Sequence, residues 1–398
     1  MKKTYFASCP KRSEEYLYEE LKELGAGQLE KKGGGVQFKA EDQLALKILF
    51  ETRLSSRIFR LLDVYPIRNE KDLYEKVTKK WWHKVFDNNQ TFKIQTLFDR
   101  DASAFFKNSM HFSMKVKDAI VDQFRRDTGK RPSIDTEDPD ISLLVRVESR
   151  GGRAAGFNVK LFLDMTNTPL SDRGYRRGRH RAPLRENLAA VLVHLSQWDS
   201  DKDSLIDIFC GSGTILIEAT MKKLNLPPSY IKIKRAKRGR KCEFAFLNHS
   251  WFVADRKLQQ WVADYFESVI ARAEAVKKQK SLNIIGSDLD ISVARENVKA
   301  AGLENHIQLL KADFKDFSPE VKTQGITLIS NPPFGERLEG GEELYYQIGQ
   351  GLLQNFKGAD AFILVSDENF RKKIFLKPTQ KYPLFNGPLD CRLIHYKL

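Results

Sequence analysis

An asparagine, two prolines and a phenylalanine, Asn331–Phe334, directly follow the apolar run Ile326–Ile329. Asn-Pro commonly marks a turn, so the simplest interpretation is a loop that ends a strand. The functional alternative is a clamp. The Asn331 side-chain oxygen and the Pro332 carbonyl can each accept a hydrogen bond, and Phe334 can stack on a ring. The four residues therefore form a candidate site for a flat, nitrogen-bearing substrate.

A glycine-rich turn, Asp207–Thr214 with the sequence DIFCGSGT, follows an apolar strand-like run and opens a helical pattern. Glycines let the backbone turn sharply and let a ligand approach closely. The turn lacks both the lysine of a P-loop and the third glycine of a dinucleotide motif. Asp207 would repel a phosphate but suits an ammonium or sulfonium group.

Acidic residues end three successive predicted strands, at Asp207, Asp288 and Asp313, and Asn331 ends a fourth. Each acid alone is commonly a helix N-cap. Together they favour a ligand crevice, because open α/β sheets bind ligands beyond the carboxyl ends of their strands. Asp288 could accept hydrogen bonds from both hydroxyls of a ribose, and Asp313, beside the apolar Phe314, could accept one from an adenine amine.

The elements that must position these residues alternate between strand and helix from residue 204 onward, which predicts a parallel, doubly wound sheet. Before it, residues 1–60 read as strand, helix, strand, helix, with Ser13 expected to cap the first helix. Residues 61–164 read as a second α+β unit, and a boundary is placed near 165. Residues 225–280 interrupt the alternation with a charged insertion, which we expect to be a surface elaboration.

The composition suits a chain of two or three domains, with 398 residues and a net charge of +15. That charge favours a phosphate-bearing partner such as a nucleic acid, although solubility alone could explain it. No apolar run reaches membrane-spanning length, and the N-terminus becomes charged too early for a signal peptide. The four cysteines show neither C-x-x-C nor zinc-ligand spacing, which predicts reduced thiols in the cytoplasm and no metal.

The motifs D-x-F-C-G-S-G-T, G-S-D-x-D, A-D and N-P-P-F, with Asp172–Arg176 (DRGYR) and Asn386–Arg392 (NGPLDCR), identify a resemblance. Over essentially its whole length, the chain resembles the THUMP-domain class I S-adenosylmethionine (SAM)-dependent RNA methyltransferases. It is similar to the guanine-N2 half of the RlmL-type enzymes and to their stand-alone homologues. A second methyltransferase of the double-headed members, which makes 7-methylguanine, is not expected because the chain ends at Leu398. Phe334 replaces the more usual tyrosine, so stacking remains available but an essential phenol does not.

The resemblance implies an α/β fold. It consists of an N-terminal ferredoxin-like domain (1–60), a THUMP RNA-binding domain (61–164), and a linker with a Rossmann-like class I methyltransferase domain (165–398). It also implies three sets of site residues. The implied cofactor-binding residues are Asp207, Cys210, Gly211, Ser212, Gly213, Thr214, Glu218, Asp288, Asp313 and Asn331. The implied catalytic residues are Asn331, Pro332, Pro333 and Phe334. The RNA-binding candidates are Lys115, Lys117, Arg131, Arg173, Arg176 and Arg179.

The sequence therefore predicts SAM-dependent methylation of an exocyclic amine of RNA, with guanine N2 of 23S rRNA, free or in a large-subunit precursor, as the leading target. Methylation of carbon 5 in pyrimidines is not expected, because that chemistry needs a cysteine beside the site and none lies near 330–338. Two alternatives remain open. The same clamp serves adenine-N6 and glutamine-amide methylation, and an RNA-binding ribosome assembly factor could carry a vestigial methyltransferase domain.

Overall fold

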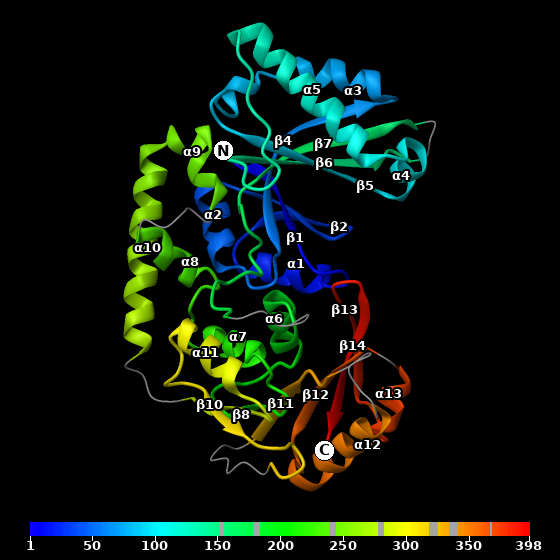
Figure 1. The fold of residues 1–398 in the computed structure, drawn as a ribbon, viewed down its shortest axis with the longest axis vertical. Coiled ribbons are helices and arrows are strands. Elements are labelled where there is room, and N and C mark those ends of the chain that lie inside the picture. The colour runs from blue at the N-terminus through cyan, green and yellow to red at the C-terminus, as the bar shows by residue number, and fades with distance from the viewer. Residues whose placement is uncertain are drawn as a thin grey trace.

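The computed structural model describes residues 1–151, 155–177, 184–238, 244–277, 282–317, 325–333, 341–366 and 368–398. Two seven-stranded sheets form its framework, one in each half of the chain (Figure 1). The elements of the first half are β1 (Lys3–Ser8), α1 (Glu14–Glu23), β2 (Gly27–Lys32), β3 (Gly35–Ala40), α2 (Asp42–Glu51), β4 (Arg57–Ile67), α3 (Glu70–Thr78), η1 (Trp82–Lys84), β5 (Phe92–Phe98), α4 (Arg100–Phe106), α5 (Ser109–Thr128), β6 (Ile141–Ser149) and β7 (Phe157–Asp164).

The second half begins with the linker that follows β7 and leads into α6. Its elements are α6 (Glu186–Leu195), β8 (Asp203–Asp207), α7 (Thr214–Lys223), α8 (Tyr230–Lys237), η3 (Ala245–Asn248), α9 (Ser250–Val253), α10 (Arg256–Val276), β9 (Ile284–Asp288), α11 (Ser292–Ala301), β10 (Gln308–Lys311), β11 (Gly325–Ser330), α12 (Gly341–Asn355), β12 (Asp360–Val365), α13 (Glu368–Lys373), β13 (Gln380–Asn386) and β14 (Leu389–Lys397).

The N-terminal sheet has the strand order β2-β3-β1-β4-β7-β6-β5. Strand β4 joins its two parts, because Arg57 to Arg60 pair with β1 and Phe59 to Ile67 pair with β7. The boundary placed at 60/61 therefore falls inside a strand that both units share. Since one ladder of hydrogen bonds runs through both units, they are held in a fixed relative position.

Two local features of the N-terminal sheet differ from the sequence predictions. Ser13 does not cap α1 through its side chain, and its buried hydroxyl makes no hydrogen bond with any of the described residues. Strand β2 was not predicted. Its sequence, GQLEKK, carries charges because β2 lies at the edge of the sheet, where such residues block pairing with other chains.

The C-terminal sheet has the order β10-β9-β8-β11-β12-β14-β13. The strands from β10 to β12 are parallel, which confirms the predicted doubly wound sheet, whereas β13 and β14 form an antiparallel hairpin at one edge. Helices cover both faces. Leu205 and Ile206, adjacent in β8, accordingly belong to two different hydrophobic cores. Burial on both faces explains why β8 reads as a short apolar run without alternation.

The insertion after α7 is not a surface elaboration, so that prediction was wrong. Phe50 of α2 is surrounded by insertion aromatics, with ring centroids 5.4 Å from Phe244, 5.9 Å from Phe246, 5.1 Å from Tyr265 and 5.4 Å from Phe266. Figure 1 shows α10 running beside the molecule from the level of α2 to that of α7 and α11 in the C-terminal half. The insertion is thus the apolar contact that fastens the N-terminal half to the C-terminal half.

Polar contacts complete this junction between the halves. The Arg53 guanidinium donates to the Leu226 carbonyl at 2.7 Å, and Arg173 donates to the Arg53 carbonyl at 2.6 Å. The Tyr265 hydroxyl donates to Glu51 at 2.5 Å. The two halves are therefore held in a defined relative orientation. Within the described ranges, no helix is both long and apolar enough to cross a membrane.

Candidate active site

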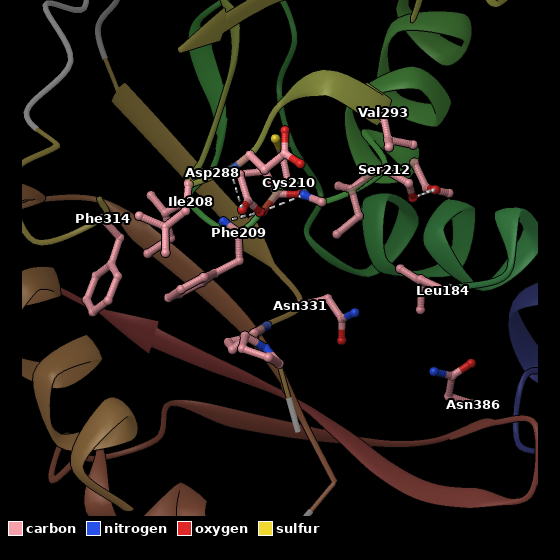
Figure 2. Close-up of a pocket in the computed structure, with 18 of the residues that line it drawn as sticks. Leu184, Ile208, Phe209, Cys210, Ser212, Asp288, Val293, Phe314, Asn331 and Asn386 are labelled. Carbon is pink, nitrogen blue, oxygen red and sulfur yellow. Dashed lines mark hydrogen bonds between the residues drawn. The ribbon is translucent and has the colours of Figure 1, made fainter. Parts of the chain in front are cut away.

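A cavity of about 1650 Å³ lies at the carboxyl ends of β8, β9, β10 and β11, and the turn between β13 and β14 closes one side of it (Figure 2). The predicted site residues that line it are Asp207, Cys210, Gly211, Ser212, Thr214, Asp288, Asp313, Asn331, Pro332 and Pro333. The parallel topology brings these residues together, because neighbouring parallel strands end at the same edge. Phe334 lies outside the described residues.

The glycine-rich turn begins the cavity wall. Gly211 and Gly213 have φ angles of +49° and +74°, a conformation that glycine adopts without a side-chain clash. A Cβ on Gly213 would lie 3.4 Å from the Ala294 side chain, an ordinary contact distance, so α11 packs directly against the turn. The Gly211 amide donates to the Asp288 carboxylate at 2.8 Å, which ties the turn to the end of β9. The turn is thus fixed in shape and open toward the cavity.

Asp207 is a strongly perturbed carboxyl group of the site. Its carboxylate is buried and accepts hydrogen bonds from the Ser330 hydroxyl at 2.5 Å and from the Phe209 amide at 3.1 Å. Burial raises the pKa of Asp207 to about 7, the two hydrogen bonds oppose that rise, and the charge of Asp288 adds to it. Burial therefore makes the ionised form of Asp207 costly, and a cation bound beside the carboxylate would lower that cost.

Asn331 follows β11 and presents an unsatisfied acceptor to the site. Its Oδ1 atom is buried and makes no hydrogen bond to any residue that the structure describes. Pro332 is buried beside it, and Pro333 is exposed. A buried acceptor without a partner costs about 1–3 kcal/mol. A donor that enters the cavity and bonds to this oxygen would remove the penalty, which makes Asn331 a preorganised receptor for an N–H group.

An apolar slot lies at the opposite end of the cavity. The buried ring of Phe314 lies against that of Phe209, with centroids 4.9 Å apart, and both residues line the cavity. Asp313 adjoins Phe314, and its carboxylate accepts a hydrogen bond from the Lys315 amide at 3.1 Å. A flat heterocycle in this slot would meet apolar surface and a carboxylate that can accept from an exocyclic amine.

Two of the predicted contacts are corrected by the structure. Glu218 does not line the cavity, and Arg173 does not reach the surface. Each is 1% exposed, and the Arg173 guanidinium donates to the Glu218 carboxylate through Nε and Nη2 at 3.2 Å each. This buried ion pair fastens the linker to α7, so direct contact of Glu218 with a cofactor or of Arg173 with RNA was wrongly predicted. Gly213 also lies behind the lining residues.

The remaining basic candidates fall into two groups. Arg176 lines the cavity, where its Nε donates to Glu186 at 2.5 Å and its Nη2 to the Thr214 hydroxyl at 3.3 Å. It therefore holds the cavity rim. Lys115 and Lys117 are half-buried on α5, and Arg131 is exposed shortly after that helix. RNA contact by these three stays a prediction, and Arg179 lies outside the described residues.

One part of the cavity wall was not assigned from the sequence. Asn386, Gly387, Pro388 and Leu389, in the turn between β13 and β14, line the cavity opposite the glycine-rich turn. The motif NGPLDCR contributed to the resemblance, and it was the signal that could have placed these residues at the site. In the part of the chain that is described, no group of three or more His, Cys, Asp or Glu side chains could hold a metal ion.

Comparison with known families identifies the C-terminal half. Residues 173–395 match the family described as "RMKL-like, methyltransferase domain". The chain belongs to this family. Residues 68–151 match the THUMP domain and residues 4–59 the RlmL ferredoxin-like domain. These matches confirm the resemblance inferred from the motifs and the predicted fold class.

Individual relatives agree with the family match. The chain is 34% identical to the ribosomal RNA large subunit methyltransferase K/L of Shewanella frigidimarina, over 99% of this chain and 52% of that protein. It is 32% identical to the protein of the same name from Shewanella amazonensis, over 99% of this chain and 53% of that protein. The chain thus spans about half the length of the curated relatives it matches.

Solved structures extend the similarity to the whole fold. A possible methylase from Clostridium difficile 630 shares 25% identity and a TM-score of 0.81, covering 100% of this chain and 98% of that chain. The structure of SMU.472 complexed with SAH shares 26% identity and a TM-score of 0.79, with the same coverage. The whole described fold is therefore similar to those of solved structures.

Proposed function

We propose that this chain transfers a methyl group from SAM to an exocyclic amine of RNA, with guanine N2 of large-subunit ribosomal RNA as the target. The buried, unpartnered Oδ1 of Asn331, directly after β11 in a cavity lined by three strand-end carboxyl groups, is the observation that carries the proposal. It combines a receptor for an N–H donor with a pocket suited to a cationic adenosine derivative.

The residues of the cavity fit SAM as the cofactor. Asp288, at the end of β9, would accept from the ribose hydroxyls, and Asp313 with the Phe314 ring would hold the adenine. Asp207 suits the positive charge of the cofactor, because a cation favours its ionised form. When bound, SAM would supply an electrophilic methyl on a sulfonium. The similar structure of SMU.472, complexed with SAH, supports this assignment.

The chain's own part in the reaction is to orient the amine. The lone pair of an exocyclic amine is delocalised into the ring, which makes the nitrogen a weak nucleophile. Asn331 Oδ1 and the Pro332 carbonyl would each accept one amine hydrogen, which localises the lone pair toward the methyl group. Fixed acceptors of this kind lower the barrier because they need no reorganisation during transfer. The alkylated nitrogen then loses one proton to solvent, so no strong base is required.

RNA as the substrate class is supported by the THUMP match and by the net charge of +15. The relatives are named ribosomal RNA large subunit methyltransferase K/L, which supports large-subunit rRNA as the substrate. A substrate of this kind would place the reaction in the cytoplasm, where bacterial ribosomes assemble. The target base must leave its stack to reach Asn331, because the clamp is recessed in the cavity.

Asn331→Ala is the variant that tests the clamp. We expect it to lower kcat for methyl transfer to unmodified rRNA by about 10²-fold or more, because one preorganised acceptor is lost. The Kd for SAM, measured by calorimetry, should remain within about threefold of the wild-type value. Asn89→Ala, at an exposed position in the N-terminal half, is the matched control and should match wild type in both measurements. Parallel loss of transfer and SAM binding, or unchanged kcat, would contradict the role.

A further inference from the structure

The turn between β13 and β14 contributes a second amide to the cavity. Asn386 is the last residue of β13, and it lines the cavity together with Asn331. Figure 2 shows the two side-chain amides directed into the same open space from different elements. A ring whose amine is bound at Asn331 would therefore extend into space that Asn386 also faces.

The position of Asn386 is fixed by contacts on both sides of the hairpin. In the β-ladder, Phe385 pairs with Asp390 and Asn386 with Leu389. From the N-terminal half, the Arg12 guanidinium lies 5.0 Å from the Phe385 ring centroid and 3.5 Å from the Asp390 carboxylate. Figure 1 shows the hairpin reaching up to this half beside α1. The Asn386 amide is thus carried by a turn whose position is fixed by the β-ladder and by the contacts with Arg12.

The Asn386 amide is half-buried, and its side chain makes no hydrogen bond with any residue that the structure describes. Other asparagines near the cavity are bonded. The Asn297 amide donates to the Ser212 carbonyl at 2.8 Å, and the Asn187 amide donates to the Ser56 hydroxyl at 2.9 Å. Those two amides hold the protein together, whereas the Asn386 amide keeps one acceptor and two donors available for a ligand.

An amide of this kind matches one edge of guanine. Beside the exocyclic 2-amine, guanine presents N1–H, a donor, and then O6, an acceptor. The Oδ1 and Nδ2 atoms of one amide can bond to both at once. Adenine with its 6-amine in the clamp presents N1, an acceptor, followed by C2–H, so the same amide could form only one hydrogen bond.

We propose that Asn386 recognises guanine by accepting from N1–H and donating to O6 while Asn331 holds the 2-amine. This inference rests on the proposed function and names the residue that selects its base. The clamp itself grips an amine and does not distinguish the two purines. In this arrangement Asn331 makes the 2-amine reactive, and Asn386 distinguishes guanine from adenine.

Two RNA fragments centred on the methylated guanosine, once mapped, test the proposal. They differ only at that position, where one carries guanine and the other 2-aminopurine, which keeps the 2-amine but lacks N1–H and O6. Wild-type enzyme should show kcat/KM at least about tenfold higher for guanine. In Asn386→Ala the ratio of kcat/KM for the guanine RNA to kcat/KM for the 2-aminopurine RNA should fall below about threefold. Most of this change should come from a lower kcat/KM for the guanine RNA.

Leu389→Ala is the matched control, because it shortens an exposed side chain that lines the cavity from the same turn without offering polar atoms. It should affect both RNAs equally, and the SAM Kd of every variant should stay within about threefold of wild type. An unchanged guanine preference in Asn386→Ala would overturn the inference while leaving the proposed function intact. If wild-type enzyme methylates neither RNA, the proposed function fails and this inference falls with it.

Discussion

Asp207→Asn is predicted to stabilise the free protein at alkaline pH while weakening SAM binding. The asparagine Oδ1 can still accept from Ser330 and from the Phe209 amide, so the local hydrogen bonds survive. What disappears is the buried carboxyl group and its titration. Because the negative charge that would face the sulfonium is also lost, the Kd for SAM should rise about tenfold or more.

The magnitude follows from the raised pKa of Asp207, which burial shifts from 3.8 to about 7 against the effect of its hydrogen bonds. The folded state therefore keeps a proton that the unfolded chain releases between about pH 4 and pH 7. Stability falls as pH rises through that window. Linkage with these two pKa values gives a loss of about 2–3 kcal/mol between pH 5 and pH 8. The asparagine variant has no such loss.

Thermal unfolding of wild type and Asp207→Asn without ligand, at pH 5 and pH 8, measures this difference, because the other titrating groups cancel between the two proteins. For a domain of this size, about 2–3 kcal/mol corresponds to roughly 5–10 °C in Tm. Between pH 5 and pH 8, the Tm of the wild-type protein should therefore fall by roughly 5–10 °C more than the Tm of Asp207→Asn. Asp316→Asn removes an exposed carboxylate nearby and controls for the loss of one charge. Equal pH dependence in wild type and Asp207→Asn would refute the reasoning.

Two further outcomes follow from the buried ion pair and the net charge. Glu218→Ala should lower the free energy of unfolding by about 3–5 kcal/mol, because it leaves the Arg173 guanidinium buried without its carboxylate. In chemical denaturation the double variant Arg173→Met, Glu218→Leu should be more stable than Glu218→Ala, and the opposite order would contradict this assignment. Raising salt from 50 to 200 mM should weaken RNA binding about 50-fold if four phosphates are contacted. SAM binding should change less than about threefold, and equal salt sensitivity of the two would exclude phosphate contacts.

The cavity residues were largely predictable from the sequence because polar residues directly follow short apolar strands. Asp207, Asp288 and Asn331 each come directly at the end of a short apolar run, and parallel strands place such residues at one edge. This prediction requires only the local sequence pattern and the parallel order of the strands. It applies to the C-terminal sheet, where the strands are buried on both faces and separated by helices.

The contacts that were wrongly assigned depend on distant parts of the chain. Arg173 and Glu218 lie 45 positions apart, and each alone has the appearance of a functional residue in a motif. Only the packing of the linker against α7 shows that they neutralise each other. Phe244 and Phe266 likewise bury themselves against Phe50, which no local pattern in the insertion indicates.

If the chain methylates guanine N2 in large-subunit rRNA, that modification depends on the presence of the protein in the cell. The most direct measurement is mass spectrometry of nucleosides and RNA fragments from the rRNA of cells with and without this protein, and of cells that carry Asn331→Ala. We expect one N2-methylguanosine site in 23S rRNA that is present with the wild-type protein and absent from both other strains. An unchanged set of N2-methylguanosines, or loss of an N6-methyladenosine in its place, would contradict it.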